Sequence, residues 1–326
     1  MMTTPLWMWV IFFAVVLTAL TIDLGLLKRE NAPLTVRQAL GRSLFFFMLA
    51  MAFNLFVFFE RGARAGSEFF MGYLIELSLS VDNLFVFLLI FTHFAVPRQY
   101  QHRVLLWGIL GAIVMRGVMI GLGTALIHQF GWIMYLFGGF LIITGIKMLI
   151  AAGEEPDVAN NRVIHFMQRH FRITRDFVGS KFFVVEDGKR YLTPLFLVLV
   201  LIEISDLIFA VDSIPAIFAV TRDPYIVFTS NIFAILGLRS LYFALAAFIH
   251  RFEYLKYGLS VILVFIGAKM VINHYQGGPV IPIQVSLLIV VTLLAASVIF
   301  SLLKTRGSRR KHTGWVPGSS SKESKE

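Results

Sequence analysis

The sequence contains no cysteine and few charged residues, and both absences restrict what this protein can be. Without cysteine, it can form no disulfide, no iron–sulfur cluster and no thiolate metal site, and it has no thiol for redox chemistry. Charged residues make up 15% of the 326 residues and hydrophobic residues 58%, whereas soluble domains have about 25% charged residues. This composition argues against a soluble enzyme and predicts an integral membrane protein.

Long apolar runs predict an all-α fold, a polytopic transmembrane helical bundle with about nine spans, because one span needs about 20 apolar residues. The second and eighth runs are short, so the count could differ by one. The expected spans are Trp7–Leu27, Ser43–Phe59, Phe69–Phe91, Val104–Ile127, Trp132–Ile150, Leu192–Val220, Tyr225–Ile249, Tyr257–Ile272 and Ile283–Leu303.

Every second loop has almost no basic residues. One set of loops, with the start of the C-terminal tail, carries twenty Lys and Arg residues, whereas the other set carries only Arg61, Arg64 and Arg222. Because cytoplasmic loops of membrane proteins are enriched in Lys and Arg, we expect the N-terminus outside and the C-terminus in the cytoplasm. No basic residue precedes the first span, so we expect a retained helix rather than a cleaved signal peptide.

An internal repeat relates spans three to five to spans six to eight. The segment from Glu76 to Asn83 aligns with the segment from Asp206 to Ser213, Arg116 roughly matches Arg239, and Gly145-Ile-Lys-Met matches Gly267-Ala-Lys-Met. Each unit has three spans, so the second copy must enter the membrane from the opposite side. Inverted repeats of this kind are typical of secondary transporters, which bind substrate near the membrane midplane.

These features divide the chain into six expected parts. The cytoplasmic loop is expected to hold a short basic helix within residues 160–171 and a β-hairpin with an Asp-Gly turn at Asp187-Gly188. The parts are two N-terminal spans (1–68), repeat A (69–150), the loop (151–191), inverted repeat B (192–273), the last span (274–303) and a basic, disordered cytoplasmic tail (304–326).

The predicted spans contain charges that a purely structural bundle does not need. Each charge at the centre of a membrane helix costs about 2.5–3.5 kcal/mol to insert, so such residues indicate a functional site. In the alternative interpretation, the acids pair with the two arginines and only hold helices together. The arginines act either as counter-charges or in gating. The charges are Glu76, Asp82, Glu203, Asp206 and Asp212, with Arg116 and Arg239.

The polar groups at this depth favour a hard or borderline cation such as Mn²⁺, Mg²⁺ or Ca²⁺, because they offer carboxylate, amide and hydroxyl oxygens. Glu76, Ser80 and Asn83 share one helix face, and Pro215 suggests a helix break just after Asp212-Ser213. All eight histidines fall in loops, tails or span ends, which argues against Zn²⁺, Cu⁺ and haem: His93, His102, His128, His165, His170, His250, His274 and His312.

Two long motifs make the sequence similar to a known family. The segments from Gly72 to Phe87 and from Glu203 to Phe218, followed by Thr229 to Arg239, resemble the signatures of the TerC family of integral membrane proteins, and most closely its Alx-type bacterial members. The resemblance implies a bacterial inner-membrane protein of metal homeostasis, with manganese efflux as its activity. The metal ligands that it implies are Glu76, Asp82, Asn83, Asp206, Asp212 and Ser213, with Glu203, Arg116 and Arg239 as accessory or counter-charge residues.

The sequence therefore predicts a transporter that exports Mn²⁺ or another divalent cation through a midplane carboxylate site, driven by proton antiport. We expect no enzymatic activity and no permanently bound cofactor. Two alternatives stay open: an accessory protein that supplies metal to exported proteins, or the membrane-bound redox modulator that gives Alx-type members their description. The expected partners are a divalent cation, the lipid bilayer and a protein that binds residues 151–191, and no nucleic acid is expected.

Overall fold

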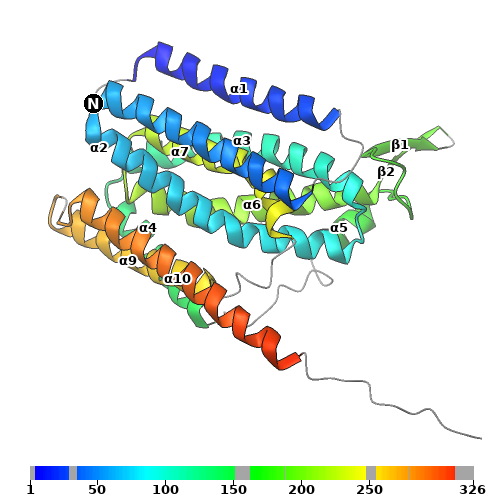
Figure 1. Ribbon diagram of the computed structural model, residues 1–326. Helices are drawn as coiled ribbons and strands as arrows, with labels where there is room; N and C mark the ends of the chain where they lie inside the picture. Colours follow the sequence, from blue (N-terminus) through cyan, green and yellow to red (C-terminus); the bar gives the residue numbers. More distant parts are fainter. Residues whose placement is uncertain are drawn as a thin grey trace, which may run out of the picture.

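The computed structural model describes residues 4–28, 35–150, 162–186, 188–246, 255–278 and 280–312. The chain is overwhelmingly helical, with one small antiparallel sheet at one end of the bundle (Figure 1). The described elements are α1 (Leu6–Lys28), α2 (Val36–His93), α3 (Arg98–Gln129), α4 (Ile133–Ile150), α5 (Arg162–His170), β1 (Phe183–Glu186), β2 (Lys189–Leu192), α6 (Pro194–Phe218), α7 (Pro224–Leu236), α8 (Leu238–Leu245), α9 (Leu255–Tyr275) and α10 (Ile283–His312).

Among the described residues, eight helical segments are long and apolar enough to cross a membrane. One of them, α2, has 58 residues and contains both the second and the third predicted spans. Its helix is interrupted at Gly62, where the backbone has a φ of 88° and a ψ of 171°, a conformation that residues with a side chain rarely adopt. The two predicted spans are therefore the two arms of α2, joined at Gly62.

The two arms of α2 fold back on each other as an antiparallel helical hairpin (Figure 1). The rings of Phe53 and Phe69 lie 5.7 Å apart, and those of Phe47 and Tyr73 lie 6.2 Å apart, so residues before the bend face residues that follow it in reverse order. Close to the bend, a Cβ atom added to Gly66 would lie 3.0 Å from Cβ of Phe58. Aromatic packing and a small residue at the bend thus hold the arms together.

The structure corrects the predicted break in the sixth span. Helix α6 is continuous through Asp212 and Ser213 and ends at Phe218, three residues after Pro215. The interruption lies in the seventh span instead, where Gly237 separates α7 from α8. A proline within the last turn removes a hydrogen bond only near the helix end, so it shortens α6 rather than breaking it.

Chain segments that alternate along the sequence gather at opposite ends of the bundle. One end, which we call the N-terminal face, contains Thr4 and residues 60–68, 218–225 and 273–278, which line a common cavity. At the other end, the hairpin face, Arg103 donates to Ser180 and Tyr242 donates to Gln101. This alternation is the arrangement expected if each predicted span crosses from one face to the other.

Helices α4 and α9 pack closely through glycine. A Cβ atom added to Gly138 would lie 3.0 Å from the carbonyl oxygen of Gly267, and one added to Gly145 would lie 2.8 Å from that of Ser260. The residue numbers in these two pairs have the same sum, so the helices are antiparallel. The repeat alignment that matches Gly145 with Gly267 also matches Gly138 with Ser260. Under this alignment, the Gly138–Gly267 contact corresponds to the Gly145–Ser260 contact. These contacts are those that an inverted repeat would make, and the repeat itself stays a prediction.

The predicted features of the cytoplasmic loop are found where the structure describes it. The short helix is α5, and strands β1 and β2 pair antiparallel, from Phe183 opposite Leu192 to Glu186 opposite Lys189. Gly188 has a φ of 72°, as a tight hairpin turn requires, whereas Asp187 lies outside the described residues. At the C-terminus, α10 continues to His312, so the helix extends into the segment from Lys304 that was expected to be disordered. Residues 313–326 are outside the described part.

The α4–α9 contact predicts a clear difference between two adjacent glycines. We expect Gly138→Ala to lower the thermal unfolding midpoint, because the added methyl would lie 2.6 Å from Cγ2 of Val271 and overpacking costs about 1–3 kcal/mol. Gly139→Ala is the matched control, because an added Cβ meets nothing within 4 Å. Unfolding of the detergent-purified variants checks this, and equal midpoints would contradict the packing.

The lack of native cysteine allows the predicted orientation to be measured directly. With Gly278→Cys on the N-terminal face and Lys189→Cys on the hairpin face, we expect a membrane-impermeant maleimide added to intact cells to label only the first. Permeabilised cells should label both. Labelling of Lys189→Cys alone in intact cells would reverse the orientation inferred from the basic loops.

Candidate functional site

Four helices bring polar side chains together around Arg116 in the middle of the bundle. Nη1 of Arg116 forms an ion pair with Oε1 of Glu76 and donates to Oδ1 of Asn231 at 2.8 Å and to Oγ of Ser213 at 3.4 Å. Asn231 also donates through Nδ2 to Oε2 of Glu76 at 3.1 Å. All four residues are at most 1% exposed. We call Glu76, Arg116, Ser213 and Asn231 the Arg116 cluster.

Helical spacing explains how α2 and α3 supply this cluster. On α3, Arg116 belongs to a buried stripe that also contains Ile109, Ala112, Ile120 and Gly123, so the face that packs into the bundle carries it inward. On α2, Oγ of Ser80 donates to Oε1 of Glu76 at 3.4 Å, one turn away. Glu76, Ser80 and Asn83, which were predicted to share one helix face, are all buried. This face of α2 therefore points into the bundle.

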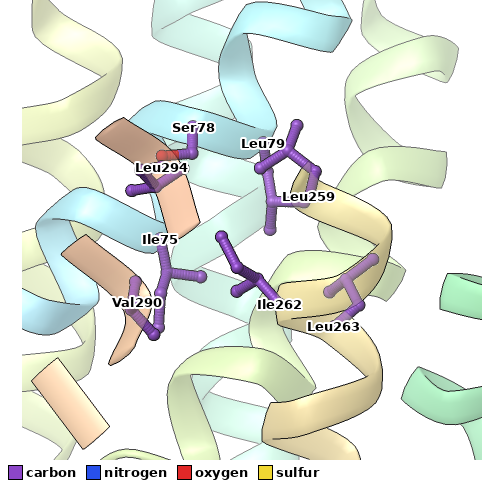
Figure 2. Close-up of a pocket in the computed structure, with 8 residues that line it drawn as sticks. All are labelled: Ile75, Ser78, Leu79, Leu259, Ile262, Leu263, Val290 and Leu294. Carbon is purple, nitrogen blue, oxygen red and sulfur yellow. The ribbon is translucent and has the colours of Figure 1, made fainter. Parts of the chain in front are cut away.

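The opposite side of the same stretch of α2 is apolar. Figure 2 shows Ile75, Ser78 and Leu79 facing side chains of α9 and α10 across a narrow crevice. The crevice has no space for a water molecule. This stretch of α2 therefore separates a dry apolar contact with α9 and α10 from the polar Arg116 cluster.

Asp206 lies beside the Arg116 cluster. Its carboxylate is 6% exposed and lies within Coulombic range of both Arg116 and Glu76. Within the described part of the chain, the side chain of Asp206 makes no hydrogen bond. One turn earlier on α6, Glu203 packs against α3 at Gly111, where any side chain would collide with its carboxylate. The glycine thus provides the room for Glu203 between the helices.

Asp212 lies in a different contact from Asp206. Its Oδ1 accepts a hydrogen bond from Thr144 of α4 at 3.4 Å, and Lys147 is within Coulombic range. Asn83 is buried on α2, and the side chain of Asp82 lies outside the described part. Among the described side chains, no three His, Asp or Glu residues lie close enough to hold a metal ion. Of the predicted ligands, the structure brings Glu76, Ser213 and Asp206 together and places Asp212 apart.

Two partners in these polar contacts were missed by the sequence analysis. Asn231 was noted only within a motif, although an amide inside an apolar helix is itself a sign of a buried hydrogen bond. Asp23 lies inside the first predicted span and was not counted among the buried acids. It forms an ion pair with Nη2 of Arg239, and both side chains are buried.

Lys269 differs from the other basic residues at span ends. It is 6% exposed, and its Nζ donates to Oγ of Ser286 at 2.6 Å. Glu68 on α2 is within Coulombic range of it. A hydroxyl on α10 and a carboxylate on α2 thus stabilise the buried amine of Lys269.

A large cavity of about 1,680 Å³ opens at the N-terminal face. Its wall contains two ion pairs, Arg61 with Asp223 at 2.5 Å and Arg64 with Glu68 at 2.9 Å. Thr221 also donates a hydrogen bond to Glu68 at 2.6 Å. Phe218, Met134 and Met270 also line it. We call this cavity the vestibule, since it leads from the N-terminal face toward the polar interior.

Comparison with known proteins shows the family. The model of the "Integral membrane protein TerC family" matches residues 61–309. The chain belongs to the TerC family. It is 48% identical over 299 residues to "Uncharacterized membrane protein STKORF319" of Myxococcus xanthus, covering 92% of this chain and 93% of that one.

Other relatives of this TerC family protein are equally well covered. It is 45% identical to an "Uncharacterized membrane protein" of Rickettsia felis, over 91% of this chain and 97% of the relative. It is 48% identical to "Putative membrane-bound redox modulator Alx" of Escherichia coli K12, over 91% of this chain and 94% of the relative. No solved structure matches this chain. The resemblance inferred from the two motifs is thereby confirmed.

Removing the Arg116 charge should destabilise the protein strongly. We expect Arg116→Met to cost about 3–5 kcal/mol, because it leaves Glu76 buried without its counter-charge. Arg64→Met is the control: its side chain is 81% exposed in its pair with Glu68, and exposed pairs contribute about 0–1 kcal/mol. Unfolding in detergent measures both. A cost for Arg116→Met as small as that for Arg64→Met would contradict this interpretation.

Proposed function

We propose that this TerC family protein exports divalent metal cations, with Mn²⁺ as the preferred ion, through the centre of its helical bundle. The observation that carries the proposal is the Arg116 cluster. A carboxylate, an amide and a hydroxyl oxygen from α2, α7 and α6 surround one positively charged nitrogen. Oxygen donors of these types are the ligands that hard divalent cations prefer.

In this proposal Arg116 occupies the cation position while the carrier is empty. An arriving metal ion displaces the guanidinium from Glu76, and Asp206, within Coulombic range of the same pair, supplies a second carboxylate. Two carboxylates balance the charge of one divalent ion. When the ion leaves, Arg116 returns to Glu76 and the core is neutralised again, so the empty protein does not leave Glu76 as an unpaired buried charge.

Export of a divalent cation from a cell that is negative inside needs a driving force. Each elementary charge moved across the membrane costs about 2.3 kcal/mol per 100 mV, so a divalent ion costs about 4.6 kcal/mol per 100 mV. In our proposal, protons that enter through Glu76 and Asp206 supply this energy. The vestibule lies on the face predicted to be outside and is the site of release.

The two alternative functions rest on other observations. The name of the Escherichia coli relative favours a redox role, although this chain has no cysteine to exchange electrons. Exposed apolar side chains on the loop before α6, Phe166, Phe183 and Val185, favour an accessory role with a protein partner. Unaided transport by the purified protein separates export from both.

Flux measurements in liposomes test the proposal. We expect the purified protein to move Mn²⁺ when a proton gradient is imposed, and Asp206→Asn and Glu76→Gln to slow this flux at least about tenfold, because each removes one metal-binding carboxylate. Asp176→Asn is the control, since Asp176 is exposed on the loop before β1. Wild-type flux equal to that of empty liposomes would refute export. Full activity of both core variants would show that the cation does not bind at the bundle centre.

A further inference from the structure

The two buried arginines of the bundle have different kinds of partner. Arg116 pairs with Glu76, and both belong to the three spans of predicted repeat A. Arg239, its counterpart in predicted repeat B, pairs with Asp23 of α1, which lies outside both repeats. The acid that corresponds to Glu76 in repeat B is Asp206. A strictly symmetric molecule would pair Arg239 with Asp206, and this structure does not.

Asp206 and Arg239 nevertheless line the same small cavity. It is enclosed by residues of α2, α3, α6, α7 and α8 and has about 10 Å³, which is the room that a single water molecule needs. Nη1 of Arg239 has no hydrogen-bond partner in the described residues, and the carboxylate of Asp206 likewise makes no hydrogen bond there. A buried cation and a buried anion thus line one cavity without being paired with each other.

A break between two helices lies just before Arg239. Gly237 ends α7 just before it, and α8 begins at Leu238. Helix-terminal positions of this kind can absorb changes in backbone torsion angles, whereas Arg116 lies in the middle of the 32-residue α3. The Asp23 carboxylate is the group that holds Arg239 on the α1 side.

We propose that Asp23 is a positioning residue: it holds the Arg239 guanidinium away from Asp206 and so keeps the Asp206 carboxylate available to a cation. This inference rests on the proposed function, because the availability of Asp206 matters only if the protein binds a cation there. The ion pairing that it describes can be measured without any metal. If Asp23 loses its charge, Arg239 turns to Asp206, the carboxylate that lines the same cavity, because a buried charge without a partner is costly.

The test measures the reactivity of Asp206 with dicyclohexylcarbodiimide in metal-free, detergent-purified protein. This apolar reagent adds to protonated buried carboxyl groups, and an Asp206 held by Arg239 should resist it. We expect Asp23→Asn to lower labelling of Asp206, quantified by mass spectrometry, at least about fivefold. The double variant Asp23→Asn/Arg239→Gln should return labelling to within about twofold of wild type. Glu203, which does not line the Asp206–Arg239 cavity, is the internal reference one turn away on the same helix.

A merely structural Asp23 predicts the opposite change. If Asp23 only held α1 to the bundle, Asp23→Asn would loosen the contact and raise labelling of Asp206; a rise, or no change, overturns the proposal. Arg239→Gln is the second variant, in case Asp23→Asn does not fold. It should leave labelling unchanged, because Arg239 is already held away, and a severalfold rise overturns the proposal.

A separate arm with MnCl₂ tests the proposed function. Protection of wild-type Asp206 by Mn²⁺ supports cation binding at this carboxylate. A lack of protection counts against cation binding there but leaves the metal-free comparison of Asp23 variants intact. Failure of the positioning role and failure of the transport role are therefore distinguishable.

Discussion

The guanidinium of Arg116 imposes the strongest constraint on this fold. A charge in the interior of an apolar bundle has to find an opposite charge and hydrogen-bond acceptors, since an unpaired one costs several kcal/mol. Glu76, Ser213 and Asn231 meet that need from three other helices. The second arm of α2 and helices α3, α6 and α7 are thereby fixed in rotation and depth relative to one another. Apolar packing alone would tolerate several rotations of each helix.

The charges outside this cluster explain why α1 belongs to the structure. Helix α1 lies at the edge of the bundle (Figure 1), and many of its side chains are exposed. Its one buried acid, Asp23, neutralises Arg239. A helix outside the predicted repeats therefore completes the charge balance of repeat B, which the acids of that repeat do not provide in this conformation. The set of helices joined by buried ion pairs is therefore larger than the six spans of the predicted repeats.

The positions of the spans could be predicted from the sequence because they depend on local composition, whereas the partners of the buried charges depend on tertiary contacts. The apolar runs predicted the helices, and the helical repeat of about 3.6 residues per turn placed Glu76 and Ser80 on one face. Spacing along one helix does not say which neighbouring helix that face meets, so Asn231 and Asp23 were missed and Asp212 was grouped with acids that it does not approach. Backbone breaks were similarly uncertain: Gly62 and Gly237 interrupt helices, whereas Pro215 lies inside one.

The same contacts that build the polar cluster also close it toward the vestibule. Glu68 on the vestibule wall and Glu76 in the core are eight residues apart on α2, about 12 Å along the axis. Between them, a Cβ atom added to Gly72 would lie 2.8 Å from Oγ of Ser230, so α2 and α7 are in direct contact at this level. Ser230 precedes Asn231, which donates to Glu76. Any separation of α2 from α7 that opened a path to the vestibule would therefore pull Asn231 away from Glu76, so access to the Arg116 cluster is coupled to the hydrogen bonds inside it.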